Sequence, residues 1–220
     1  MNLFLSFLRF SFPSSPKKRR SNLLEPRVDN DSPKETEMNR MLATLALLAC
    51  CATLVHAEER ALNKAAIIGA PVAEVWKAWT TSEGIQSFFA PEAFVEAKPM
   101  GKFWIHFNPY AAPGLKGADD MIVLAVQEGK MISFTWNAPP YLPEVRGQRT
   151  YVTVRMKALN DKETEVTLFH GGWGDGGQWD DTYKYFDTAW GKVLSNLQKR
   201  FVEQKPIDWT PFLERLKNPK

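Results

Sequence analysis

The sequence predicts an α+β fold in which a curved antiparallel sheet packs against one long C-terminal helix. Apolar and polar residues alternate in short segments between positions 61 and 170, which is typical of strands with one buried face. From Trp179 onward the apolar period changes to three or four residues, which indicates an amphipathic helix to about Glu203. With 220 residues, 44% of them apolar and 24% charged, the chain has a globular composition and can bury a sizeable core.

The first part of this domain is expected to contain one strand and two short helices. Residues 61–68 (ALNKAAII) form the predicted strand. Proline is favoured in a first helical turn, so Pro71 opens a helix whose apolar face carries Val72, Val75, Trp76 and Trp79. A second helix over 83–89 is expected to end before Pro91.

An antiparallel sheet of six strands is expected next. Strand-like runs separated by turn residues lie at 94–97, 102–108, 120–127, 131–136, 148–158 and 163–170. Residues 128–130 and 160–162 have the composition of tight hairpins. The chain shows no internal repeat or linker, which predicts one domain.

The last helix and the tail complete the predicted domain. Apolar residues recur every three or four positions on one face of this helix, namely Tyr183, Phe186, Ala189, Trp190, Val193, Leu194, Leu197 and Phe201. Pro206 ends this helix, so the domain is expected to span 58–205 and to be followed by a tail, 206–220. Within that tail, Trp209 and Phe212 are expected to dock on the domain.

The formal charge of +3 belongs to the first 57 residues, which contain eight Lys/Arg and five Asp/Glu, while the remainder is neutral. An apolar stretch at 41–54 follows Arg40 and precedes Val55-His56-Ala57, as in a secretory signal peptide with a small-x-small cleavage site. It is too short to cross a bilayer comfortably. The predictions are a signal peptide at 38–57 and, at 1–37, a mis-assigned gene start or disordered extension.

Other interpretations of the leader stay open. The basic run 17–20 can be a nuclear or nucleic-acid patch, and 41–54 can be a buried helix. Leu47-Leu48-Ala49-Cys50 loosely resembles a lipobox, so Cys50 is a candidate for lipidation. An exported protein would be periplasmic or secreted, whereas a failed signal prediction would make it cytoplasmic. After cleavage near Glu58 no cysteine remains, which excludes disulfides, thiol nucleophiles and Cys-ligated zinc.

Four stretches resemble a known family. They are 70–80 (APVAEVWKAWT), 101–105 (GKFWI), 128–136 (EGKMISFTW) and 188–197 (TAWGKVLSNL), where Ala189 replaces the usual glycine. In order and spacing they resemble the START-like (SRPBCC) superfamily, and within it the branch of the activator of the heat-shock protein 90 ATPase. The resemblance spans about 61–203 and implies a helix-grip, Bet v-type fold. It says little about activity, because the superfamily includes lipid carriers, cyclases, hydrolases and co-chaperone domains.

A G-x-G-x-x-G pattern occurs at Gly172–Gly177 but is a weak candidate for a nucleotide site. No strand follows the helix after it, so no βαβ unit forms. Asp175, Asp180 and Asp181 also place negative charge at the helix start, where a pyrophosphate would bind. The segment is therefore expected to be a flexible loop. Alternatively, Trp173 and Trp179 gate a cavity or touch a membrane surface.

Two histidines remain as candidates for chemistry. His106 and His170 with Asp119 or Asp120 would form a two-His, one-carboxylate metal set, but their spacing supports nothing specific. His170 can be a general base oriented by Asp175 or Asp180. The weak catalytic candidates are therefore His170, His106 and Asp175, with no metal and no cofactor expected.

Aromatic residues are the strongest functional signal. All eight Trp, all five Tyr and ten of the fourteen Phe lie after residue 57. We expect Phe169 and a set of candidate ligand-binding residues to face the space between sheet and helix or its rim, the set being Trp76, Trp79, Phe103, Phe107, Phe134, Trp136, Phe186 and Trp190. They either fill the core or line a pocket, whose mouth the Pro-rich loops 108–114 and 137–143 would cover.

These observations favour an exported protein that binds a hydrophobic small molecule or lipid and no nucleic acid. Contact with a membrane surface is a further candidate interaction, and the sequence names no protein partner. The alternatives are an enzyme of cyclase or hydrolase type that uses His170 or His106, and, if the chain is cytosolic, a module that regulates a chaperone ATPase.

Overall fold

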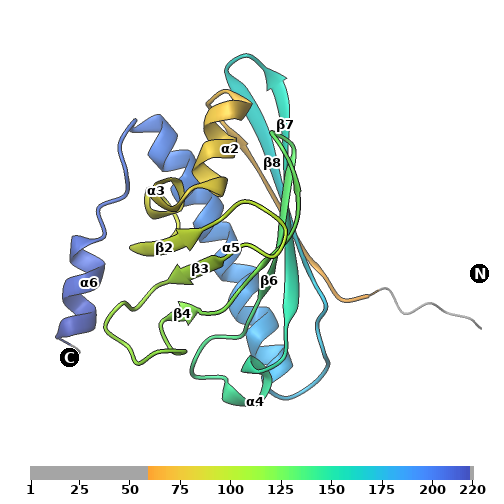
Figure 1. Ribbon diagram of the computed structural model, residues 1–220, viewed down its shortest axis with the longest axis vertical. Coiled ribbons are helices and arrows are strands. Elements are labelled where there is room, and N and C mark those ends of the chain that lie inside the picture. Colours follow the sequence, from red (N-terminus) through yellow and green to blue (C-terminus); the bar gives the residue numbers. More distant parts are fainter. Residues whose placement is uncertain (1–58, 219–220) are drawn as a thin grey trace, which may run out of the picture. The chain divides into compact units, whose positions relative to one another are not determined.

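The computed structural model describes residues 59–218 and confirms the predicted α+β fold, with a curved antiparallel sheet against a long helix (Figure 1). The predictions for 1–37 and 38–57 lie outside the described residues. Five strands form the main sheet in the order β1-β8-β7-β6-β5, with every neighbouring pair antiparallel. Their bounds are β1 Leu62–Ile68, β5 Val123–Gln127, β6 Met131–Trp136, β7 Thr150–Asn160 and β8 Glu163–Gly171.

The expectation of one sheet for the six later strands was wrong, because three strands form a separate small sheet. It has the order β2-β3-β4, with bounds β2 Glu92–Val95, β3 Phe103–His106 and β4 Gly117–Ala118. An isolated bridge, Lys102 to Ile122, and neighbouring backbone hydrogen bonds such as Phe103 N–H to the carbonyl of Met121 link it to the segment before β5. The predicted strand 120–127 starts only at Val123, because Asp120 has a φ of 60° and interrupts the extended backbone.

Two short helices follow β1. They are α2 Val72–Thr80 and α3 Ser82–Gln86, the second shorter than the predicted 83–89. The hydroxyl of Thr81 accepts the backbone N–H of Gly84 at 3.0 Å and caps α3. A Cβ on Gly84 would lie 2.4 Å from the carbonyl oxygen of Lys77, so the close approach of the two helices requires glycine.

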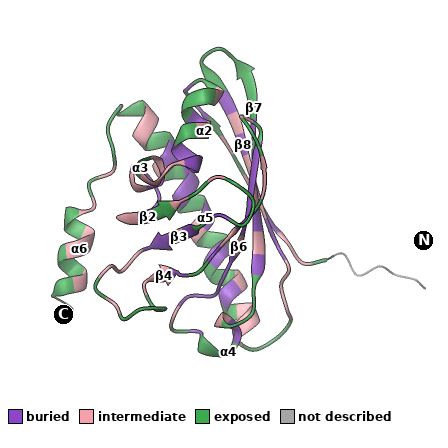
Figure 2. Ribbon diagram, viewed as in Figure 1, coloured by how far each residue is buried: buried purple, intermediate pink, exposed green. Residues whose placement is uncertain are grey.

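The core lies between the inner face of the main sheet and α5, Gln178–Val202 (Figure 2). The buried side of α5 carries the residues that the 3.6-residue period predicted, namely Phe186, Trp190, Val193, Leu194 and Leu197. Full burial of an aliphatic or aromatic side chain stabilises the fold by about 1.5–3 kcal/mol. Within residues 59–218, no helix combines the length and the apolar character that a membrane span requires.

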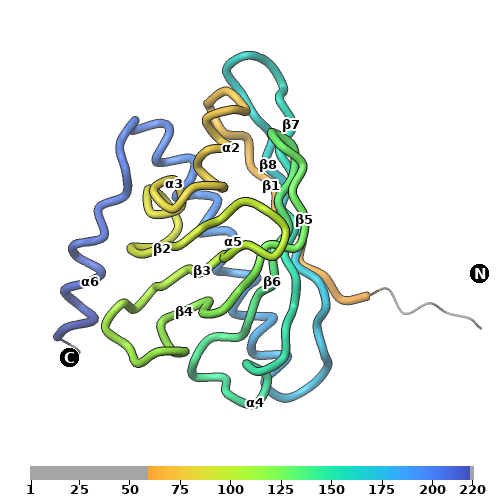
Figure 3. The backbone as a smooth tube through the Cα atoms, in the orientation of Figure 1, coloured from red at the N-terminus to blue at the C-terminus, as the bar shows by residue number. Residues whose placement is uncertain are grey.

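Two short helices were not predicted from the sequence. Residues Pro143–Arg146 form α4 and Thr210–Lys217 form α6. The predicted docking of Trp209 is confirmed, because its indole N–H donates to the carbonyl of Gln86 at 2.6 Å. The chain after α5 therefore turns back beside α3 (Figure 3).

A candidate ligand pocket at one end of the helix-sheet interface

Two pockets lie where β6, α5 and the small sheet meet. Pocket 1 has a volume of about 400 Å³ and pocket 2 about 250 Å³. Both are lined by the same four aromatic side chains, Phe107, Trp136, Tyr185 and Phe186. The two volumes therefore share an aromatic wall.

Loops form the outer part of pocket 1. It is lined by residues of the β3–β4 connection and of the segment after β6, namely Asn108, Ala111, Leu115, Lys116, Asn137, Ala138, Pro139, Pro140 and Tyr141. The rings of Tyr141 and Tyr185 meet edge to face, with centroids 6.1 Å apart. Burial raises the pKa of the Tyr185 hydroxyl, and Tyr141 raises it further. The Pro-rich loops thus lie at this pocket, as expected.

The tail and α5 form pocket 2. Its lining includes Trp209 and Phe212 on the tail side, and Ala189, Lys192, Val193 and Asn196 on α5. The two tail aromatics were expected to dock on the domain and not to line a pocket. Tyr185 was not predicted as a pocket residue, although it lies one turn before Ala189 on the same helix.

The eight predicted ligand-binding residues divide between pocket and core. Four line one or both pockets: Phe107, Trp136, Phe186 and Trp190. Trp79, Phe103 and Phe134 are fully buried and do not line the pockets, and Trp76 packs half-buried against the core. The rings of Phe103 and Phe134 stack with centroids 3.8 Å apart, which leaves no space between them. The aromatic residues therefore fill one part of the interface and line a cavity in another.

Phe169 was wrongly expected to face this interface. On β8 the buried residues are Thr164, Val166, Leu168 and His170, and side chains alternate across a strand. Phe169 therefore faces the opposite side of the sheet, where its ring lies 5.7 Å from that of Tyr151.

His170 is fully buried, and both of its ring nitrogens are hydrogen-bonded. Trp190 Nε1 lies 2.9 Å from Nδ1, and Thr150 Oγ1 lies 2.7 Å from Nε2. An indole N–H only donates, so Nδ1 is the acceptor and Nε2 carries the proton. Burial lowers the pKa of His170 to about 3. The imidazole is thus neutral and a poor base at ordinary pH.

The predicted orienting carboxylates do not contact His170. Asp180 instead accepts a hydrogen bond from Arg60 at 2.6 Å, which lowers the pKa of this carboxyl group. Asp175 is exposed in the loop before α5. The expected relay from His170 to Asp175 or Asp180 was therefore wrong, because the imidazole turns into the aromatic core.

The glycine-rich loop before α5 serves packing. A Cβ on Gly174 would lie 2.3 Å from Trp179 Nε1, so the indole lies directly over this glycine. Trp173 donates to the carbonyl of His170 at 2.8 Å, and its ring centroid lies 4.1 Å from the imidazole. Both tryptophans thus pack against the domain.

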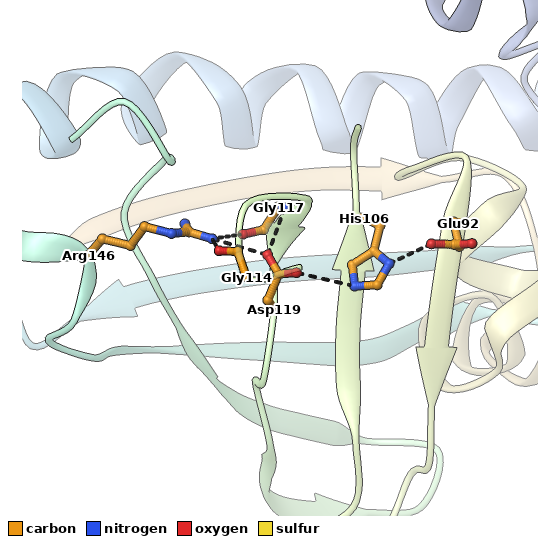
Figure 4. A network of polar contacts seen from close by, with 6 residues as sticks. All are labelled: Glu92, His106, Gly114, Gly117, Asp119 and Arg146. Atoms are coloured by element: carbon orange, nitrogen blue, oxygen red, sulfur yellow. Dashed lines mark hydrogen bonds and ion pairs between the residues drawn. The ribbon is translucent and has the colours of Figure 1, made fainter. Parts of the chain in front are cut away.

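A row of polar contacts joins the small sheet to α4 (Figure 4). His106 Nδ1 lies 2.5 Å from Glu92 Oε2, its cross-strand neighbour, and Nε2 lies 3.7 Å from Asp119 Oδ1. Asp119 Oδ2 accepts the backbone N–H of Gly117 at 2.9 Å and lies 3.1 Å from Arg146 Nη2. His106 does not line either pocket. His106 is therefore away from the cavity surface, whereas Gly117 at the other end of the row lines pocket 1.

Arg146 ties together the two loops that line pocket 1. It donates to the carbonyls of Gly114 at 2.8 Å and Gly117 at 2.7 Å, and also to the carbonyl of Ala138. Burial lowers the pKa of the guanidinium, whereas Asp119 raises it. Arg146 fixes the spacing of the loops, a role that cannot be read from sequence because its partners are backbone carbonyls.

The two histidines are not brought together. His106 lies in the small sheet and His170 in the main sheet, and each has its own set of partners. In residues 59–218, no three His, Cys, Asp or Glu side chains are grouped so that they could hold a metal ion.

Comparisons with known proteins agree on the fold. A family model described as Activator of Hsp90 ATPase homolog 1-like protein matches residues 69–201. The structure is similar to that of a Mesorhizobium loti protein, with a TM-score of 0.53 and 20% identity over 67% of this chain and 100% of the other. A Nitrosomonas europaea protein is similar with a TM-score of 0.52 and 21% identity, and the match covers 70% of this chain and 100% of the other.

A third structure, the Aha1 dimer from Colwellia psychrerythraea, has a TM-score of 0.50 and 19% identity over 64% of this chain and 96% of that one. No curated protein matches the sequence. Matches at these identities show the fold alone.

Proposed function

The chain belongs to the Activator of Hsp90 ATPase homolog 1-like family, in the START-like superfamily, and we propose that it binds a hydrophobic small molecule or lipid between the sheet and α5. The aromatic wall shared by pockets 1 and 2 is the observation that carries this proposal. Pocket 1, at about 400 Å³, is within the usual range of about 300–1,000 Å³ for ligand sites, and pocket 2, at about 250 Å³, is slightly smaller. Stacking on indole and phenyl rings would favour flat or chain-like apolar groups.

The chemistry of the histidines favours binding over catalysis. The pKa of His170 is about 3 because of burial, and Nδ1 is engaged by Trp190. A general base needs a pKa near the working pH and reach to the substrate. His106 is in hydrogen-bonding contact with Glu92 and lines neither pocket. An enzyme using either histidine is therefore the weaker candidate.

Co-purified ligand provides the direct test. Residues 58–220 would be purified without detergent and extracted with organic solvent, and the extract would be analysed by mass spectrometry. Binding of the neutral dye N-phenyl-1-naphthylamine would be followed by fluorescence. We expect a bound apolar compound, or saturable dye binding near one dye per chain.

Pocket-filling variants make this test specific. Ala111→Trp places an indole in pocket 1 and Ala189→Trp in pocket 2. Each should weaken dye binding about tenfold or more, since a blocked cavity cannot accept a ring. Ala73→Trp, on the exposed side of α2, is the matched control and should bind normally. A folded protein without extractable ligand or dye binding would refute the proposal.

We also propose export, on the basis of the apolar stretch at 41–54 and the neutral charge of the remaining chain. N-terminal sequencing of the protein from cell fractions should find a start near Glu58 in the periplasm or medium. A lipidated start at Cys50 would place it on a membrane instead. Recovery in the cytosol with Met1 intact would contradict export and raise the standing of a chaperone-regulating role.

A further inference from the structure

Each of the two pockets is lined by one charged residue, which in both cases is a lysine. Lys116 lines pocket 1 and Lys192 lines pocket 2, and neither pocket is lined by an Asp or Glu. Neither lysine forms an ion pair with the described residues. A bound ligand would therefore meet a positive potential and no carboxylate.

The nearest acidic side chain in sequence, Asp119, is already engaged. Its two oxygens face Arg146, the backbone N–H of Gly117 and the ring of His106. Arg146 also brings a second positive charge close to the wall of pocket 1. The positive charge of Lys116 is thus not offset locally.

Asn137 adds a buried polar group at the same pocket. It is only 5% exposed, lines pocket 1, and its carboxamide makes no hydrogen bond with the described residues. The carboxamide of Asn137 is therefore available to a ligand atom.

The backbone around Lys116 is held in place. Its carbonyl accepts the N–H groups of Phe107 and Asn108, both at 2.9 Å, and the following Gly117 is bonded to Arg146 and Asp119. The lysine therefore stands on a hairpin fixed against the pocket.

From these observations we infer that the ligand is a monocarboxylate with an apolar body. Its carboxylate is bound by the ammonium of Lys116 and the carboxamide of Asn137 in pocket 1. Its apolar body lies against the shared aromatic wall and extends toward pocket 2. One cation and one amide suit a single negative charge. This inference rests on the proposed function, because it names the class of ligand for the same cavity.

Matched ligands separate the inference from the function on which it rests. Decanoate and 1-decanol have the same chain length and differ in the charge of the head group. Titration calorimetry at pH 7.5 and below the micelle concentration of decanoate should give about tenfold tighter binding of decanoate, as expected for a charge-assisted contact.

Substitution locates the head group. Lys116→Gln should reduce the affinity for decanoate about tenfold and leave that for decanol within twofold. Asn137→Leu should act in the same direction. Lys157→Gln, an exposed lysine on β7 that lines neither pocket, removes the same charge and is the control. Circular dichroism verifies that each variant is folded, and Lys116→Arg should restore the preference if the charge is what matters.

The outcomes are distinct. Equal binding of decanoate and decanol overturns the inference and leaves the proposed function intact. Loss of the preference in Lys192→Gln but not in Lys116→Gln also overturns it, because the carboxylate would then lie in pocket 2. If neither ligand binds to the folded protein, the inference and the proposed function both fail for this ligand size.

Discussion

The indole N–H of Trp190 donates a 2.9 Å hydrogen bond to Nδ1 of His170, and this contact joins the long helix to β8, an inner strand of the main sheet. Both side chains are almost completely buried. The bond assigns the tautomer of the imidazole and holds it neutral against the aromatic core. His170 is therefore a structural residue, and its chemistry can be tested through stability.

Replacing the donor should destabilise the fold. Trp190→Phe removes the indole N–H, leaves Nδ1 of His170 buried without a partner and opens a small void. We expect the free energy of unfolding to fall by about 2–4 kcal/mol in urea denaturation. Trp104→Phe, half-buried on β3, is the control and should cost about 1 kcal/mol or less. Equal losses in the two variants would contradict the importance of the bond.

Stability should also depend on pH through His170. Its pKa is about 3 in the folded state and about 6.5 when unfolded, so between these values the unfolded chain binds more protons. The stabilisation is fully present above pH 6.5 and is lost as the pH falls toward 3, by about 1.4 kcal/mol per pH unit.

Comparison with His170→Gln isolates this contribution, because the two proteins differ at this side chain alone. Unfolding free energies would be measured by urea denaturation from pH 4 to 8. Below pH 6 the free energy of unfolding of the wild type should rise more steeply with pH than that of the variant. Above pH 7 the two curves should be parallel. Parallel slopes over the whole range would mean that His170 is protonated in the folded state.

Arg146 is expected to control the loops around pocket 1. Arg146→Met removes the guanidinium that donates to the carbonyls of Gly114, Gly117 and Ala138 and to the carboxylate of Asp119, which keeps the backbone N–H of Gly117. We expect a loss of about 3 kcal/mol in stability. Amide exchange should become faster in 108–118 and 137–142, since loop opening would then require less free energy.

Arg149→Met is the matched control, because Arg149 is exposed and, among residues 59–218, donates only to the carbonyl of Arg146. It should leave exchange in both loops nearly unchanged. If Arg146→Met exchanged no faster than this control, the loops would be held by their own turns and not by the guanidinium.

The main elements could be predicted from sequence because their periodicity reports burial directly. Alternation in β7 and β8 and the apolar face of α5 follow from contact with a single core. The strand β4 has only two residues, and α4 has four, so neither is long enough to show a period. The start of β5 at Val123 follows the left-handed backbone of Asp120, which hydrophobicity does not reveal.

The site was predictable only in its general character. An excess of aromatic residues indicated either a filled core or a pocket, and both occur. Whether a given ring fills the core or lines the pocket depends on how closely the layers approach. Phe134 stacks on Phe103 in the core, whereas Trp136, two residues later on the same strand, borders the cavity. Asn137 and Lys116 gave no sequence signal, because their distinction is the lack of a partner in the folded chain.

The tail should act as one wall of pocket 2. Trp209 and Phe212 line this pocket, and the segment is held by the indole bond to Gln86 and by the N–H of Ile207, which donates to the carbonyl of Ser87 at 2.9 Å. The side chains of α6 are otherwise exposed or half-buried, so its attachment depends on few contacts.

We therefore expect Trp209→Ala to release the tail while the domain stays folded. The free energy of unfolding of the domain should fall by at most about 3 kcal/mol. Dissociation of N-phenyl-1-naphthylamine, measured by stopped-flow dilution, should become several-fold faster because one wall is gone. Phe201→Ala, half-buried at the end of α5 and outside the pocket lining, is the control for loss of an aromatic ring. Unchanged dissociation in Trp209→Ala would mean that the dye occupies pocket 1 alone, and that the tail contributes to docking and not to ligand retention.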